Sequence, residues 1–240
     1  MLTLRHTELD LLQRCPRQYE FFRTVGPLPP GAALHFGSSY HEGQRAAFTG
    51  KVATGEYNLL EASDAYSDYF DKYKEFEVVF GEDEKPGPMK DLGFKLLALY
   101  AGELAPSVMP KEVEATRETL ALPDCTLRGR LDLITLDDDI IDHKTTSRLP
   151  SERDLANDIQ VNTYFLLDPS AEEFHFHYAH KTKLAVFDKA TSRTAKEQDW
   201  FVRVLLTRYV EMIKAGIFPP SIEGWWCSPA WCGWFPICGR

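Results

Sequence analysis

The chain has 240 residues, of which 44% are hydrophobic and 26% are charged, and its formal net charge is −9 at pH 7. Its 15 Phe, 10 Tyr and 5 Trp exclude intrinsic disorder, because they supply a large apolar surface to bury. The acidic balance argues against a protein that coats nucleic acid through bulk charge. No apolar run approaches the roughly 18 residues of a membrane helix, and the charged N-terminus is unlike a signal peptide. We therefore expect neither a membrane span nor secretion.

The first half of the sequence predicts helices, because apolar and aromatic residues recur there at helical spacing. Thr7 is the expected N-cap of the first helix, and Pro16 disturbs it. Pro- and Gly-rich segments predict a loop at Val25–Ala33 and a break at Gly81–Pro88. The expected helices are Glu8–Arg14, Gly37–Phe48, Leu59–Phe76 and Leu92–Leu104.

The second half changes to short strand-like segments, with later helices at Glu152–Leu167, capped by Ser151, and at Ala195–Ala215, ended by Gly216. This order predicts an α/β fold: a small central mixed sheet flanked by helices, with a helical insertion in the N-terminal half. We expect a single domain over residues 1–240. The expected strands are Val113–Leu122, Thr126–Leu136, Asp139–Lys144, Phe174–Ala179 and Lys183–Phe187.

The central feature is the pair of segments GRLDLI and IDHK, which contain Asp132, Asp142 and Lys144. A hairpin between their strands brings the two carboxylates together, and Lys144 shares a strand face with Asp142. Two carboxylates suit a hard divalent cation such as Mg²⁺. The lysine then orients a water or stabilises charge on a phosphate.

The D-x-K pattern alone is weak and equally describes a surface Asp–Lys pair. Its apolar surroundings favour a site, because charges embedded in buried strands require partners. Gln160 and Tyr164 follow at helical i, i+4 spacing and share one helix face. Upstream, His41 lies in the helix that opens at Gly37.

These features in this order resemble the RecB-like branch of the PD-(D/E)XK nuclease superfamily. That branch has a G-x-x-x-H helix, a G-x-x-D strand, a D/E-x-K strand and a Q-x-x-x-Y helix, and the resemblance extends from Cys15 to Cys238. It implies a restriction-endonuclease-like core and an active DNA hydrolase. It also implies metal ligation by His41, Asp132, Asp142 and the carbonyl of His143, a water positioned by Lys144, and support of the site and of the DNA backbone by Gln160 and Tyr164.

One early cysteine, Cys15, and three late ones, Cys227, Cys232 and Cys238, resemble an iron–sulfur subset of these nucleases. That subset includes the AddB nuclease and the CRISPR-associated nucleases of spacer acquisition, where four thiolates hold a 4Fe–4S cluster joining the two ends of the chain. Here four residues, instead of the usual two, separate the first two tail cysteines. Zn²⁺ is the alternative metal. A third interpretation has no metal: the cysteines are free thiols buried in a Trp-rich hydrophobic tail. Cys125 lies on an expected strand and is expected in the core.

The resulting hypothesis is a Mg²⁺- or Mn²⁺-dependent DNA nuclease, an exonuclease on single strands or DNA ends. Its setting would be recombination, repair or spacer acquisition in the cytoplasm of a bacterium or a phage host, alongside a recombination or repair protein. The alternative is a non-catalytic DNA-binding or scaffold subunit, and a weaker one is a site-specific endonuclease. A further expectation is a DNA path lined by Phe36, Tyr40, Arg5, Arg14, Arg17 and Arg23.

Overall fold

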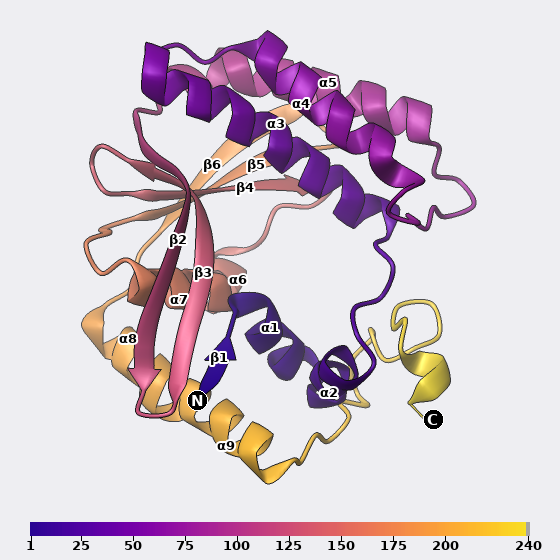
Figure 1. Ribbon diagram of the computed structural model, residues 1–240, viewed down its shortest axis with the longest axis vertical. Coiled ribbons are helices and arrows are strands. Elements are labelled where there is room, and N and C mark those ends of the chain that lie inside the picture. Colours follow the sequence, from indigo (N-terminus) through magenta and orange to yellow (C-terminus); the bar gives the residue numbers. More distant parts are fainter. Residues whose placement is uncertain (239–240) are drawn as a thin grey trace.

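The computed structural model describes residues 1–238, in which helices flank a mixed sheet (Figure 1). Within this range the sheet has six strands, with β1, β3, β4, β5 and β6 side by side in that order and β2 also paired to β3. The strands are β1 Leu2–Leu4, β2 Pro110–Leu122, β3 Cys125–Thr135, β4 Ile140–Thr146, β5 Phe174–His180 and β6 Ala185–Thr191. The helices are α1 His6–Arg14, α2 Pro16–Thr24, α3 Ala32–Thr54, α4 Leu59–Phe70, α5 Pro86–Glu103, α6 Glu152–Ala156, α7 Ile159–Leu167, α8 Ala195–Trp200 and α9 Thr207–Ala215.

Two hydrophobic cores cover the two faces of the sheet. On one face, α3, α4 and α5 pack over β4, β5 and β6, where Phe48 and Tyr100 are buried with Ile141 and Ala179. On the other face, α1, α7 and α9 pack against β1, β3 and β5. Alternation along β4 places the neighbouring residues Ile140 and Ile141 in different cores. The predicted mixed α/β architecture, with helices inserted in the N-terminal half, is confirmed.

One edge of β3 pairs with β1 at one end and with β4 at the other, which leaves a gap between these two strands. β2 pairs antiparallel with β3 from Cys125 to Thr135, so it occupies one whole edge. On the other edge, β1 pairs with residues 125–127 and β4 pairs only at Leu133 and Ile134. The strand segment between these contacts, which contains Asp132, therefore faces an opening between β1 and β4.

Several helix boundaries differ from the sequence prediction. Thr7 as the N-cap of α1 is wrong: the cap is Arg5, whose backbone N–H donates to the side chain of Glu8 at 3.1 Å. Pro16 begins a further helix, α2, because proline is well suited to the first helical position. The predicted single helix Glu152–Leu167 is wrong as well: it is divided into α6 and α7, and the Asp158 carboxylate caps the second by accepting from Val161 N at 3.1 Å.

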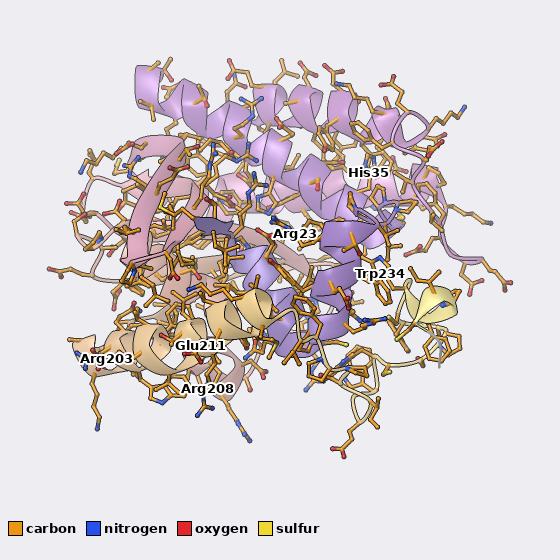
Figure 2. The ribbon with its side chains drawn as sticks, turned by 60° about the horizontal axis from the view of Figure 1, so that its bottom comes forward. Arg23, His35, Arg203, Arg208, Glu211 and Trp234 are labelled. Atoms are coloured by element: carbon orange, nitrogen blue, oxygen red, sulfur yellow. The ribbon has the colours of Figure 1, made fainter. Side chains whose placement is uncertain are left out.

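The C-terminal segment returns to the N-terminal helices. Trp234 and Cys232 are buried against Phe21 of α2, and Figure 2 shows Trp234 beside the helix that carries Arg23. Before this segment, α9 ends at Gly216 in a left-handed conformation with φ 65°, as predicted. None of the helices among residues 1–238 combines the length and the apolar character that crossing a bilayer requires.

Candidate active site

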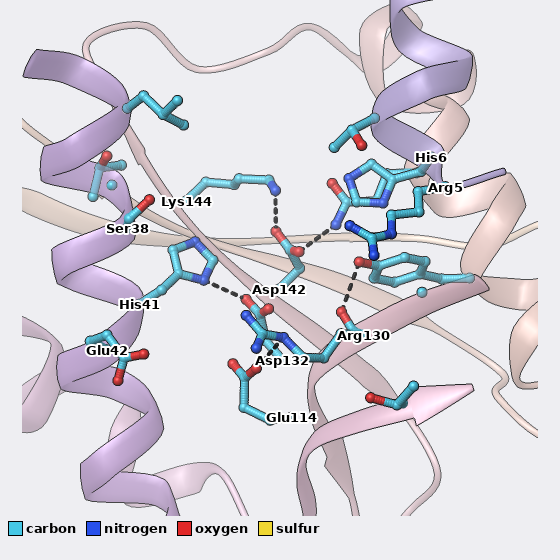
Figure 3. A pocket seen from close by; sticks show the side chains of 18 of the residues that line it. Arg5, His6, Ser38, His41, Glu42, Glu114, Arg130, Asp132, Asp142 and Lys144 are labelled. Atoms are coloured by element: carbon cyan, nitrogen blue, oxygen red, sulfur yellow. Dashed lines mark hydrogen bonds and ion pairs between the residues drawn. The ribbon is translucent and has the colours of Figure 1, made fainter. Parts of the chain in front are cut away.

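A pocket of about 830 Å³ opens at the gap between β1 and β4 (Figure 3). Its walls come from α1, α3, α4 and α7 and from strands β2, β3 and β4, so seven elements of the chain contribute to it. The predicted residues whose side chains line the pocket are His41, Asp132, Asp142, Lys144, Gln160 and Tyr164.

Asp132 lies at the centre of the first group of contacts. Its Oδ2 is 2.9 Å from Nδ1 of His41 on α3, and it accepts a hydrogen bond of 3.0 Å from the backbone N–H of His143. This N–H is free of the β3 ladder because β3 and β4 pair only as far as Ile141. In an extended strand, the N–H and C=O of one residue point to the same side. The carbonyl of His143 therefore faces the gap together with its N–H.

Asp142 and Lys144 form the second group, on the same face of β4. Asp142 is 2% exposed, and its Oδ2 lies 2.7 Å from Lys144 Nζ. The buried amide of Gln160, on α7, donates to Asp142 Oδ1. Apart from this ion pair, the buried Asp142 Oδ2 has no hydrogen-bond partner among the described residues. This carboxylate is therefore held in one orientation while one oxygen keeps coordinating capacity.

Tyr164 joins helix α7 to strand β3. Its hydroxyl donates to the carbonyl of Arg130 at 2.9 Å, and its ring packs where Gly129 leaves room. A Cβ at Gly129 would lie 3.1 Å from Tyr164 Cε1 and 2.5 Å from Leu167 Cδ1. The glycine of GRLD thus allows α7 to approach β3 closely and to place Gln160 on Asp142.

The pKa values of the two aspartates move in opposite directions. Burial raises the pKa of Asp142, and the nearby Asp132 raises it further, while Lys144 opposes the change. Burial also acts to raise the pKa of Asp132, but His41 and His143 outweigh it and lower that pKa well below its ordinary value. Burial lowers the pKa of Lys144, yet both aspartates outweigh it and raise the pKa. Lys144 is therefore a cation at neutral pH.

Glu114 of β2 is a pocket residue that the sequence did not identify. Its strand neighbours Val113 and Ala115 pair with Leu133 and Leu131, which places Glu114 beside Asp132. Its φ of 56° is unusual for a residue other than glycine, and such strain is typical of functional sites. Burial and the charge of Asp132 raise the pKa of Glu114. Only the antiparallel register of β2 opposite the GRLD segment of β3 indicates that Glu114 belongs to the pocket.

The prediction that Phe36 and Tyr40 line a DNA path is wrong, and of the four arginines predicted with them only Arg5 lines the pocket. Phe36 and Tyr40 are fully buried, because their side chains face the hydrophobic core beneath α3 rather than the pocket. Arg5 does line the pocket, together with Arg128 and Arg130 of β3. The other three arginines lie on α1 and α2 and contact neighbouring side chains: Arg14 with Gln18, Arg17 with Glu20 and Arg23 with Glu8.

The four predicted cysteine ligands line one small cavity between α2 and the C-terminal segment. Two of their sulfurs accept hydrogen bonds from distant parts of the chain. Gln18 Nε2 donates to Cys232 Sγ at 3.3 Å, and Ser221 N donates to Cys15 Sγ at 3.4 Å. Cys125 lies elsewhere, fully buried in the core as predicted.

The donor set of the pocket fits a divalent cation. Carboxylate oxygens are the ligands that Mg²⁺ prefers, and one imidazole suits Mn²⁺ as well. Asp132, Asp142 and His41 supply these groups around a pocket open to solvent, and within residues 1–238 the Lys144 ammonium is the one polar group paired with Asp142 Oδ2.

Comparison with known proteins agrees with this geometry. The sequence profile of the PD-(D/E)XK nuclease superfamily matches residues 3–239. Among solved structures, a "Putative exonuclease" from Eubacterium rectale superposes with a TM-score of 0.64 at 11% identity, covering 94% of this chain and 86% of its own. The structure of SSO0001 superposes with a TM-score of 0.48 at 17% identity, covering 100% of this chain and 87% of its own. Among curated proteins, the comparison gives no match.

The mixed sheet with flanking helices is therefore the restriction-endonuclease-like fold of a nuclease. The chain belongs to the PD-(D/E)XK nuclease superfamily, whose members typically use divalent metal ions.

Proposed function

We propose that the protein is a Mg²⁺- or Mn²⁺-dependent deoxyribonuclease, an exonuclease that acts on single strands or DNA ends. The observation that carries the proposal is the convergence of Asp132, Asp142, Lys144 and His41 in one solvent-open pocket. The Eubacterium rectale protein of the same fold bears the name of an exonuclease, which is the mode of cleavage assigned here.

In this proposal, His41, Asp132, Asp142 and the carbonyl of His143 hold the metal. A divalent ion held there would neutralise charge on the scissile phosphate and make a bound water more acidic. Gln160 fixes the orientation of Asp142 through its amide donor. His41 and the backbone N–H of His143 fix Asp132 in the same way. Both carboxylates are thereby oriented before substrate arrives.

We assign Lys144 the role of an ammonium donor, because its Nζ lies 2.7 Å from Asp142 Oδ2 at the edge of the pocket. Its ammonium group donates a hydrogen bond to the attacking water, orients it in line with the phosphorus and stabilises the developing charge on the phosphate. Arg5, Arg128 and Arg130 line the same pocket and are the guanidinium groups assigned to the DNA backbone, for which Arg128 and Arg130 would exchange their ion pairs with Glu118 and Glu114.

We also assign the four cysteines to a 4Fe–4S cluster that joins the two ends of one domain. The four cysteines line one cavity between α2 and the C-terminal segment, so their thiolates are gathered where one metal group could hold them. Four thiolates suit an iron–sulfur cluster or zinc on ligand count, and the missing C-x2-C knuckle favours the cluster. We place the protein in recombination, repair or spacer acquisition in a bacterial cytoplasm, with a repair or recombination protein as partner.

The test is cleavage of a 5′-labelled oligonucleotide by anaerobically purified protein with Mg²⁺ or Mn²⁺. Asp142→Asn and Lys144→Ala should each abolish cleavage, whereas Asp137→Asn, an exposed turn residue, should retain it. A closed DNA circle that resists cleavage supports the exonuclease. Equal cleavage by the wild-type and Asp142→Asn proteins would exclude the proposal, and absence of cleavage with retained DNA binding would favour the scaffold alternative.

A further inference from the structure

A cluster of two histidines and an aspartate lies on β5 and β6, outside the nuclease pocket. His175 and His177 alternate along β5 and therefore point to the same face of the sheet. Asp188 is the cross-strand partner of His177 on β6. One ligand atom from each residue lies within 4.8 Å of the other two. Adjacent rigid strands thus present two imidazoles and a carboxylate toward one point.

The spacing of these groups is close to that of a tetrahedral zinc site. Asp188 Oδ1 lies 2.9 Å from His175 Nδ1 and 3.8 Å from His177 Nε2. Metal bonds of about 2.0–2.1 Å in a tetrahedron place neighbouring ligand atoms roughly 3.3 Å apart. The two distances fall on either side of this value. All three ligand atoms also lie within 4.8 Å of one another, so one ion could be reached by all of them after side-chain rotation.

The orientation of His177 is fixed by a buried tyrosine. The Tyr100 hydroxyl lies 2.8 Å from His177 Nδ1 and 3.0 Å from His143 Nε2, and all three side chains are buried. The hydroxyl carries one proton. When it donates to His143, Nδ1 of His177 must carry a proton and donate to the hydroxyl. In this arrangement, Nε2 of His177 has a lone pair that faces Asp188.

An ordinary surface ion pair accounts for only part of this cluster. It explains His175 and Asp188, which contact each other directly, but it leaves His177 Nε2 without a hydrogen bond among the described residues. A histidine whose second ring nitrogen bonds to a buried partner is the usual arrangement of a metal ligand. Asp188, whose side chain is 41% exposed, keeps the cluster accessible to an ion from solvent.

We propose that His175, His177 and Asp188 form a second metal site, of the zinc class, with water as the remaining ligand. The ligand set of two imidazoles and one carboxylate favours Zn²⁺ over Mg²⁺, which prefers oxygen ligands throughout. Tyr100 orients the site by holding His177. Through His143 it also reaches Asp132, since His143 Nδ1 lies 3.8 Å from Asp132 Oδ2.

The experiment measures zinc bound to the full-length protein by equilibrium dialysis and metal analysis. Because the cysteines and the nuclease pocket also bind metals, the result is the difference between matched variants. Asp188→Asn and His175→Gln remove ligands at accessible positions, and Asp137→Asn makes the same Asp-to-Asn change on an exposed turn. We expect the wild type and Asp137→Asn to bind one more equivalent of zinc than the two site variants. Circular dichroism verifies that each variant is folded.

A second measurement separates a metal site from a hydrogen-bonded cluster. The ring-proton NMR signals of His175 and His177 should shift on addition of Zn²⁺ in the wild type and remain unchanged in Asp188→Asn. Tyr100→Phe, which keeps the ring and loses the hydroxyl, should weaken zinc binding by about 10–100-fold. Equal zinc binding by the wild type and Asp188→Asn, with no shift of either histidine, would overturn the proposal.

Discussion

Gln160 illustrates how one buried amide determines the geometry of a charged group. Its Nε2 donates to Asp142 Oδ1, so the carboxylate has one oxygen fixed by α7 and the other directed toward Lys144. Without this donor, Lys144 alone would orient the carboxylate, and the buried Oδ1 would lose its hydrogen bond from Gln160. Partners of this kind usually affect metal affinity as strongly as they affect activity.

We therefore expect Gln160→Met, which has similar volume and no donor, to reduce cleavage by about 10–100-fold. The Mg²⁺ concentration for half-maximal activity should increase in parallel, because Asp142 is less well oriented. Leu166→Met, a change on the same helix outside the pocket, is the matched control. An unchanged metal dependence with reduced cleavage would assign Gln160 to DNA contact instead.

His6, which lines the pocket, makes the folding stability depend on pH. Its ring lies edge-on to Tyr164, and burial together with Lys144 lowers its pKa from 6.5 to about 4. Because the unfolded state then binds the proton more tightly, the contribution to stability is fully present above pH 6.5. It is lost as the pH falls from 6.5 toward 4.

The substitution His6→Phe keeps the aromatic contact and removes the titration. We expect the variant to lose about 1–2 kcal/mol less stability than the wild type between pH 7 and pH 4, after allowing for partial exposure to solvent. Urea unfolding at both pH values measures the difference. Equal losses in the two proteins would show that His6 titrates normally in the folded state.

The approach of α7 to β3 depends on the absence of a side chain at Gly129. An added Cβ would lie 2.5 Å from Leu167 Cδ1 and 3.1 Å from Tyr164 Cε1, so α7 would have to shift or the side chains would have to rearrange. We expect Gly129→Ala to lower the free energy of unfolding by about 1–3 kcal/mol, the usual cost of overpacking. Denaturant unfolding measures this loss.

Gly37 provides the matched control on another wall of the pocket. A Cβ there would make an ordinary contact of 3.5 Å with Thr145 Oγ1, and the residue lies inside α3. Alanine in a helix interior is favoured over glycine by about 0.5–1 kcal/mol. Gly37→Ala should therefore be neutral or stabilising. Similar losses for both variants would mean that close packing at Gly129 is not what distinguishes the two sites.

The sequence was informative where a pattern is local. Alternation and apolar flanks were sufficient to predict the β3–β4 hairpin with Asp132 and Asp142, and helical spacing placed Gln160 and Tyr164 on one face. The three-residue strand β1 has too few residues to show a period. Glu114 enters the pocket only through its register opposite Asp132, which a single sequence does not reveal.

Within the described residues, the C-terminal segment contacts the N-terminal helix α2. Gln18 and Cys232, 214 residues apart, are joined by a buried hydrogen bond, and Trp234 packs with them against α2. The apolar cluster that these contacts form is small, with Phe21, Cys232 and Trp234 as its buried residues. A cluster held by Cys15, Cys227, Cys232 and Cys238 would constrain the unfolded chain much more strongly. Cross-linking a loop of 100 residues or more stabilises by about 4–5 kcal/mol in the chain-entropy description.

We therefore expect Cys15→Ala to eliminate the broad visible absorption of a 4Fe–4S cluster in anaerobically purified protein and to lower the free energy of unfolding by several kcal/mol. Cys125→Ala is the control, because this cysteine is fully buried in the core and lies outside the cysteine cavity. It should lose some stability through the smaller side chain but retain the absorption. Zinc in place of iron in the wild-type protein would assign the alternative metal. Absence of both metals, with equal stability in the wild type and Cys15→Ala, would show that packing alone joins the ends of the chain.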